Sequence, residues 1–170
     1  RWSDGEPLTV DDWLFWWYDM ALDDNVAVTR QTGTFVNDVN MEVERIDDYT
    51  LKLSFVAPNP LFIEIMSRGT GDRATSWQIV PAHYLKQFHL KYNDKAGDLA
   101  KEAGFDFWYQ LFGRESNPDQ SVDLPTTMPF MVVRDTTSTA FLERNPYFWA
   151  VDVEGNQLPY IDQLVHDRIA

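Results

Sequence analysis

The chain of 170 residues lacks cysteine, has few basic residues and contains no long apolar run. Without cysteine it can form no disulfide, thiolate zinc site or cysteine nucleophile, and this absence is compatible with any compartment. No apolar stretch approaches the roughly 18 residues that a membrane span needs. The 14 Lys and Arg face 27 Asp and Glu, which gives a formal net charge of -13. This balance argues against nucleic acid, whose phosphates require a basic surface, and against anionic membranes.

Aromatic residues are abundant, at 15% of the chain with seven tryptophans. They suit a large core, and they also suit a cleft whose rings stack on sugars or peptide side chains. The length allows one domain that buries roughly 70% of its unfolded surface. The sequence opens without Met or a signal peptide. We interpret it as a segment of a longer protein, and a trimmed mature N-terminus is the alternative.

Residues 10–22 are predicted to form a helix, with Thr9 as N-cap and Asp12 three residues later as an acidic capping box. At about 100° per residue, one face is apolar and the other acidic. The apolar face carries Val10, Trp13, Leu14, Trp17, Met20 and Ala21, and the acidic face carries Asp11, Asp12 and Asp19. Phe15 falls inside the acidic stripe and Trp16 at its border. Either the protein covers this helix on two sides, or these two rings face a cleft or a missing segment.

The remaining pattern predicts an α+β fold with a mixed sheet, a hairpin and flanking helices. A hairpin is expected at 41–46 and 51–55, with the side of Leu51, Leu53 and Phe55 buried. Helices are expected at 61–66, 81–90, 94–103 and 105–112, with Gly104 ending the third. Strands are expected at 130–133, 140–143 and 164–169, and loops at 67–78, at 113–127 and at 26–40, where the loop could include a short strand.

Motifs for nucleotides, metals and catalysis find little support. Residues 69–74 read G-x-G-x-x-A, the dinucleotide fingerprint, but Pro81 lies too close for the helix that should follow. His83 and His89 are about 240° apart on a helix and cannot share a metal, and His166 stands alone in a strand. All three are expected to be satisfied surface or half-buried histidines. We expect no cofactor, no metal site and no catalytic residue. A pair of carboxylates facing each other across a sugar, as glycosidases need, stays open.

Five blocks in order resemble one protein family. They are W-S-D-G-E-P-L-T-x-D-D at 2–12, I-D-D-Y-T-L-K-L with P-N-P-L-F at 46–53 and 58–62, I-V-P-A-H-Y-L at 79–85, F-L-E-R-N-P-Y-F-W at 141–149, and D-V-E-G-N-Q-L-P-Y-I-D at 152–162. Each block alone is weak, but together they resemble the family 5 extracellular solute-binding proteins. These proteins are the dipeptide, oligopeptide, nickel and oligosaccharide receptors of ABC importers. One departure is Met128-Pro129-Phe130, where the family usually has Gly-Pro before an aromatic residue, so the turn there is expected to differ.

The resemblance implies a partial first lobe of a two-lobed receptor over residues 1–170. Residues 1–92 correspond to an extra subdomain, and 93–170 to helices and strands that lead towards the second lobe. The implied function is extracytoplasmic: the lobe, in the periplasm or in a cell-surface lipoprotein, delivers an oligopeptide or oligosaccharide to an ABC permease and catalyses nothing. Candidate solute contacts are Trp77, Arg73 and Arg68 in the glycine-containing loop.

Two other functions and one property remain as expectations. The chain could be part of an acidic glycoside hydrolase, which turns over a chromogenic sugar, or a protein-interaction domain whose aromatic residues meet a partner. Unpaired strand edges and bare apolar surface further predict self-association of this chain, with weak or no solute binding by the chain alone.

Overall fold

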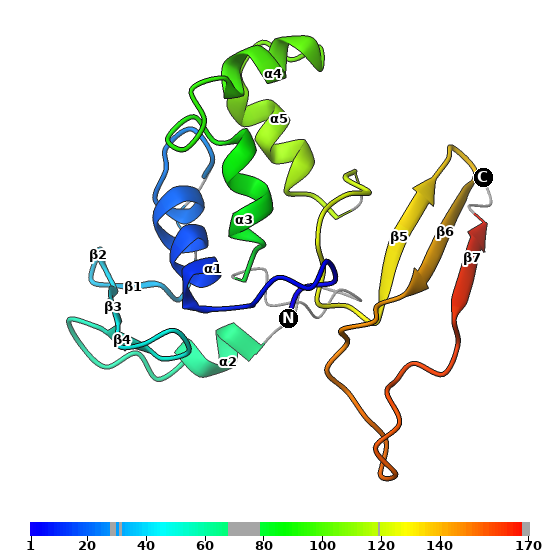
Figure 1. Cartoon of the computed structure of the whole chain (residues 1–170). Coiled ribbons are helices and arrows are strands. Elements are labelled where there is room, and N and C mark those ends of the chain that lie inside the picture. The colour runs from blue at the N-terminus through cyan, green and yellow to red at the C-terminus, as the bar shows by residue number, and fades with distance from the viewer. Residues whose placement is uncertain (28–29, 31, 68–78, 119, 168–170) are drawn as a thin grey trace. The chain divides into compact units, whose positions relative to one another are not determined.

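The computed structural model describes residues 1–27, 30, 32–67, 79–118 and 120–167. The chain divides into two compact units, and Figure 1 labels the helices and strands of both. One unit is Thr9–Ala82, and the other joins Arg1–Leu8 to His83–Ala170. The two units are described separately below.

A helix with two geometries opens the unit Thr9–Ala82. It begins as α1 (Val10–Phe15) because Thr9 and Asp12 form the capping box, with Thr9 N–H donating to Asp12 Oδ2 at 3.0 Å. It continues as the π-helix η1 (Trp16–Ala21), and Leu22 N–H closes the last turn on the carbonyl of Trp17 at 3.1 Å. The single α-helix predicted for 10–22 is therefore wrong from Trp16 onward, because a five-residue hydrogen-bond step replaces the four-residue step.

Two short hairpins and a helix complete this unit. β1 (Phe35–Val36) pairs with β2 (Val39–Asn40), and β3 (Glu42–Arg45) pairs with β4 (Leu51–Ser54), both antiparallel. Helix α2 (Phe62–Ser67) follows. The core of the unit consists of Trp16, Trp17 and Met41, all at most 4% exposed. Partly buried side chains pack around it: Trp13, Met20, Ala21, Val43, Leu53, Phe55, Phe62 and Val80. The hairpin face that was predicted to be buried, with Leu51, Leu53 and Phe55, is therefore only half-buried.

The other unit begins with helices. α3 (Ala82–Leu85) starts at the boundary and tightens into the 3₁₀ helix η2 (Lys86–Phe88), so the helix predicted for 81–90 ends early. α4 (Ala96–Glu102) and α5 (Trp108–Glu115) follow. Gly104 has φ +84° after α4, as its predicted role in ending that helix requires. Leu85, Ala96, Ala100 and Phe112 are fully buried in the core of these helices.

A three-stranded antiparallel sheet ends the chain. β5 (Phe130–Asp135), β6 (Thr139–Arg144) and β7 (Gln163–Asp167) lie in that order, with β6 in the middle. The register of β5 on β6 shifts between Val132 and Arg134, which marks a bulge. A long connection from Asn145 to Asp162 joins β6 to β7. The N-terminal turn also belongs to this unit, where the N–H of Ser3 donates a hydrogen bond to the carbonyl of Thr126 at 3.0 Å.

The predicted α+β class is confirmed, while its sheet differs in detail. Instead of one mixed sheet, the described strands form sheets of two, two and three strands, and every pairing in that part of the chain is antiparallel. The aromatic helix predicted at 105–112 lies three residues later, because Phe107 adopts an extended conformation and caps α5.

Candidate functional site

The three predicted solute contacts, Trp77, Arg73 and Arg68, lie outside the described residues. The structure does, however, describe Phe15 and Trp16, for which the sequence left two interpretations open. Phe15 is 2% exposed and Trp16 is 4% exposed. The interpretation in which this helix is covered on two sides is therefore confirmed, and neither ring faces an open cleft.

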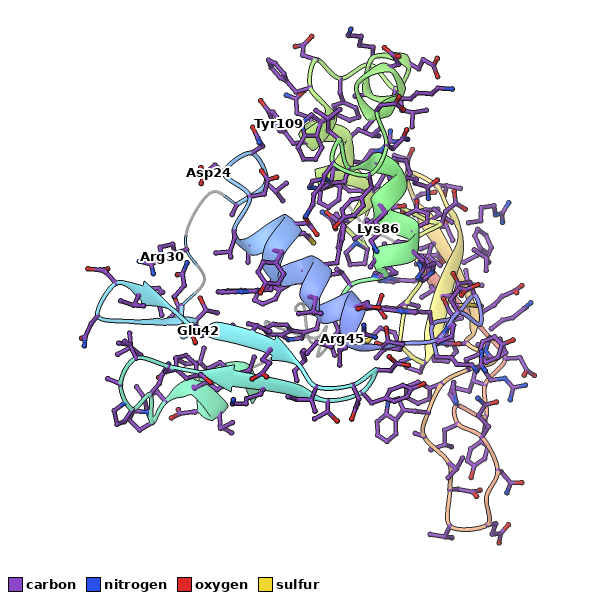
Figure 2. All side chains as sticks on the ribbon, turned by 60° about the vertical axis from the view of Figure 1, so that its left-hand side comes forward. Asp24, Arg30, Glu42, Arg45, Lys86 and Tyr109 are labelled. Carbon is purple, nitrogen blue, oxygen red and sulfur yellow. The ribbon has the colours of Figure 1, made fainter. Side chains whose placement is uncertain are left out.

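A groove of about 530 Å³ lies within the unit Thr9–Ala82, between the end of η1 and the hairpin β3–β4. Figure 2 shows Glu42 on β3, the strand that runs along this groove. Its lining combines aromatic, apolar and charged groups from both sides. The lining residues are Trp17, Tyr18, Leu22, Asn40, Met41, Glu42, Val43, Glu44, Lys52 and Ser54.

The π-helix places the helical wall of this groove. Trp17 is buried in the core, whereas the next residue, Tyr18, is 49% exposed. The Tyr18 hydroxyl donates to the backbone carbonyl of Val43 at 3.5 Å, which holds the ring beside β3. Because an aromatic ring offers an apolar face and Tyr adds a polar end, this wall can stack on a sugar ring or a peptide side chain.

The strand wall of the groove carries two carboxylates and one ammonium group among its polar and apolar residues. Glu44 faces Lys52 across the hairpin, and their side chains form an ion pair at 2.9 Å. The hydrogen bond with Glu44 and its charge raise the pKa of Lys52, and Glu42 adds to this effect. Ser54 stands opposite Glu42 in the register. The groove therefore offers carboxylates, an ammonium group and a hydroxyl to a polar solute.

A second polar cluster, which the sequence did not indicate, is buried in the helical part of the other unit. Glu115 accepts hydrogen bonds from Tyr84 at 2.8 Å, from Ser121 at 2.6 Å and from Arg114. Burial alone would raise the pKa of Glu115, but the bonds from Ser121, Arg114 and Tyr84 outweigh it and lower that pKa. The pKa of Tyr84 is raised to about 12, and burial is the main cause. Because these groups saturate one another, the cluster fixes α3, α5 and the turn at Ser121 rather than binding solute.

The three histidines lie in different surroundings, and His166 is exposed on β7, as predicted. His83 Nε2 is 2.8 Å from Asp4 Oδ2, and its ring lies beside Trp2. His89 is 2% exposed between the rings of Trp108 and Phe112, so the prediction of a surface or half-buried residue is wrong for it. The aromatic residues of α5 bury it, and they lie about twenty residues away in sequence. In the described part of the chain, no group of three or more His, Asp or Glu side chains could hold a metal ion.

The Asp152 loop is closed by its own hydrogen bonds. Asp152 accepts from the backbone N–H of Glu154 and Asn156, both at 2.8 Å, and from the Tyr160 hydroxyl at 2.5 Å. The bond from Tyr160 is the main reason that the pKa of Asp152 lies well below its usual range, with Asn156 next. Its oxygens are thus engaged in holding a turn.

The sequence blocks and the fold identify the class of protein, which is that of the extracellular solute-binding proteins. The chain belongs to the bacterial extracellular solute-binding proteins, family 5 Middle, whose family profile matches residues 1–169. The structure is similar to the oligopeptide-binding protein OppA, with a TM-score of 0.86 and 37% identity, over 100% of this chain and 26% of that one.

Two further relatives are linked to sugars, one by its name and one by the ligand in its structure. The periplasmic alpha-galactoside-binding protein of Rhizobium meliloti (strain 1021) is 31% identical over 96% of this chain and 21% of its own length. The periplasmic binding protein MelB of Agrobacterium fabrum C58, solved in complex with stachyose, has a TM-score of 0.68 and 27% identity, over 98% of this chain and 23% of its own. The chain thus spans about a fifth to a quarter of the relatives it matches. Within the described residues, no helix is long and apolar enough to cross a membrane.

Proposed function

We propose that this chain is the solute-binding part of an extracytoplasmic receptor that delivers oligopeptides or oligosaccharides to an ABC importer. The family match over residues 1–169 carries this proposal. The two ligand classes follow from the relatives, since OppA is an oligopeptide-binding protein and MelB was solved with stachyose. The receptor works in the periplasm or as a cell-surface lipoprotein, and its partner is the permease of the importer.

The proposed mechanism is closure of two lobes around the solute by a hinge, with no covalent step. Residues 1–170 form part of the first lobe, with 1–92 as the extra subdomain and 93–170 leading towards the second lobe. Aromatic rings supply contact area, and a few polar groups fix the orientation of the solute. A receptor of this kind leaves its solute chemically unchanged.

Solute contact is proposed for Trp77, Arg73 and Arg68. The indole ring of Trp77 would stack on the solute, and the two guanidinium groups would donate hydrogen bonds to its carboxylate or hydroxyl oxygens. The groove beside η1 is a second candidate surface, supported by the exposed ring of Tyr18 next to Glu42 and Lys52. Both surfaces can be tested by single substitutions.

The test is calorimetric titration of the natural gene product that carries this chain, with stachyose and with a set of tri- to pentapeptides. One of the two classes should bind saturably. Trp77→Ala should then weaken binding about tenfold, equivalent to about 1.4 kcal/mol. Trp149→Ala is the matched control, because Trp149 is 80% exposed and is assigned to neither surface. Equal affinities for the two variants would exclude Trp77 as a contact.

The same protein distinguishes the rival functions. Turnover of a chromogenic sugar, abolished by changing one carboxylate, would establish a hydrolase. Capture of a protein in the absence of any effect of sugars or peptides would establish an interaction domain. The receptor function requires saturable solute binding, and the solute must be recovered intact.

A further inference from the structure

The groove between η1 and the hairpin β3–β4 is built within one unit of the chain. Its walls come from the end of η1, from β2 and from both strands of the hairpin. The described lining residues run from Trp17 to Ser54, so all of them lie inside the unit Thr9–Ala82. The volume of about 530 Å³ falls within the range of about 300–1,000 Å³ that small-molecule sites occupy. The groove is therefore large enough for part of a small solute.

The charges in this groove favour a neutral solute. Among the described lining residues, the one ammonium group is that of Lys52, and Glu44 already pairs with it at 2.9 Å. Glu42 lies on the same wall (Figure 2). Glu44 chiefly, and Glu42 to a lesser degree, raise the pKa of Lys52, so its charge persists at neutral pH. An anionic solute would be repelled by Glu42 and a cationic solute by Lys52, whereas a neutral solute meets neither repulsion.

A second cation close to the groove is also paired. Arg30 donates to the side-chain oxygen of the lining residue Asn40 at 2.6 Å. Its guanidinium group lies 3.4 Å from the carboxylate of Asp38 and 4.0 Å from the ring centre of Phe35. Lys52 and Arg30 thus each have an acidic partner, so the terminal carboxylate of a peptide would have to compete with that partner for either cation.

The other polar groups of the lining suit the hydroxyl groups of a sugar. The carboxylates of Glu42 and Glu44 accept hydrogen bonds, the ammonium group of Lys52 donates them, and the hydroxyl of Ser54 can do both. Two neighbouring hydroxyls can therefore bond to both members of the ion pair at once. Tyr18 is half-exposed beside these groups and offers an apolar ring against which the C–H face of a sugar can pack.

We propose that this groove binds one sugar residue of a neutral oligosaccharide, with the sugar ring against Tyr18 and its hydroxyls on Glu42 and the Glu44–Lys52 pair. The inference rests on the proposed function, which names oligosaccharides and oligopeptides, and it assigns the sugar class to this groove. Tyr18 is then a specificity-determining residue, because its ring supplies the apolar contact that a sugar face uses.

The first test is calorimetric titration of the natural gene product with stachyose, maltotetraose, trialanine and trilysine. An oligosaccharide should bind, and Tyr18→Ala should raise its dissociation constant about tenfold because the packing ring is lost. Tyr49→Ala is the matched control in the same unit. Tyr49 is 77% exposed at the turn between β3 and β4 and does not line the groove, so this variant should bind as the wild type does.

The outcomes separate this inference from the proposed function. If an oligosaccharide binds with equal affinity to both variants, as it would if another part of the natural protein covered the groove, the inference is overturned and the receptor function stands. Binding of trialanine or trilysine alone has the same consequence. Absence of binding by all four solutes would overturn the proposed function, and this inference with it.

Acylation of lysines in the wild-type protein reads the occupied groove without any substitution. The Lys52 side chain is 62% exposed and can react with acetic anhydride. At about ten times the dissociation constant of the oligosaccharide, roughly nine tenths of the sites are filled, so acylation of Lys52 should slow about tenfold. Lys101, exposed on α4 in the other unit, is the control and should react equally with and without the solute. Unchanged acylation of Lys52 at saturation would overturn the inference.

Discussion

Asp12 is the residue whose removal should damage the unit Thr9–Ala82 most clearly. Its side chain is 4% exposed and accepts two backbone hydrogen bonds. Asp12 Oδ2 accepts from Thr9 N–H at 3.0 Å, which closes the capping box. Asp12 Oδ1 accepts from the buried N–H of Ala82 at 3.0 Å, across 70 residues of sequence. One carboxylate thus starts the helix and attaches the end of the unit to it.

The substitution Asp12→Ala leaves both donors without this acceptor. Loss of the cap costs about 1 kcal/mol, and a buried donor left without a partner costs about 1–3 kcal/mol. We expect a loss of about 2–4 kcal/mol in the free energy of unfolding, or about 4–16 °C in Tm at 2–4 °C per kcal/mol. Asp12→Asn should fall between wild type and Asp12→Ala, since its amide oxygen can replace only one of the two acceptors.

Asp11→Ala is the matched control on the same helix. The Asp11 side chain is 57% exposed, and its carboxylate lies 3.8 Å from Arg45. An exposed pair of this kind contributes less than about 1 kcal/mol. Urea denaturation followed by tryptophan fluorescence measures the difference, and hydrogen exchange of the Ala82 amide reports the lost acceptor directly. If Asp12→Ala and Asp11→Ala agree within about 0.5 kcal/mol, the carboxylate does not have the role assigned to it.

Three further predictions concern the other unit. Tyr84→Phe should cost about 1–1.5 kcal/mol in urea denaturation, because one hydrogen bond to Glu115 is lost; no change would mean that the bond contributes nothing. Because the folded-state pKa of Glu115 is lowered, its stabilisation is present above the ordinary value of 4.5 and is lost as the pH falls through the folded-state value. Glu115→Gln should therefore differ most from wild type near neutral pH, and a constant difference down to acid pH would refute this. Gly104→Ala should cost about 1–2 kcal/mol in thermal unfolding because of its positive φ, whereas Gly113→Ala inside α5 should stabilise by about 0.5–1 kcal/mol; effects of the same sign would contradict this reasoning.

The sequence predicted those features that depend on neighbouring residues. The capping box at Thr9, the hairpin that includes Leu53, and the helix end at Gly104 each follow from residues a few positions apart, and the structure contains all three. It could not predict the burial of Asp12. The spacing places that residue on an acidic face, and only the distant N–H of Ala82 explains why a carboxylate is buried there.

The candidate site likewise combines features that neighbouring residues predict with features that depend on distant contacts. The family blocks indicate a solute receptor, but the groove depends on a π-helix that turns Tyr18 outward while Trp17 stays buried, and helical periodicity assumes an α-helix throughout. The Glu115 cluster joins Tyr84, Glu115 and Ser121 across 31 and 6 residues. No local spacing marks such a set, so tertiary packing alone brings it together.

Calorimetry of the natural gene product, followed by chromatography of the recovered solute, tests the receptor function most directly. We predict saturable binding of one molecule of an oligosaccharide such as stachyose or of an oligopeptide, and recovery of that molecule unchanged. Conversion of the bound molecule, or absence of binding across both classes, would contradict the account.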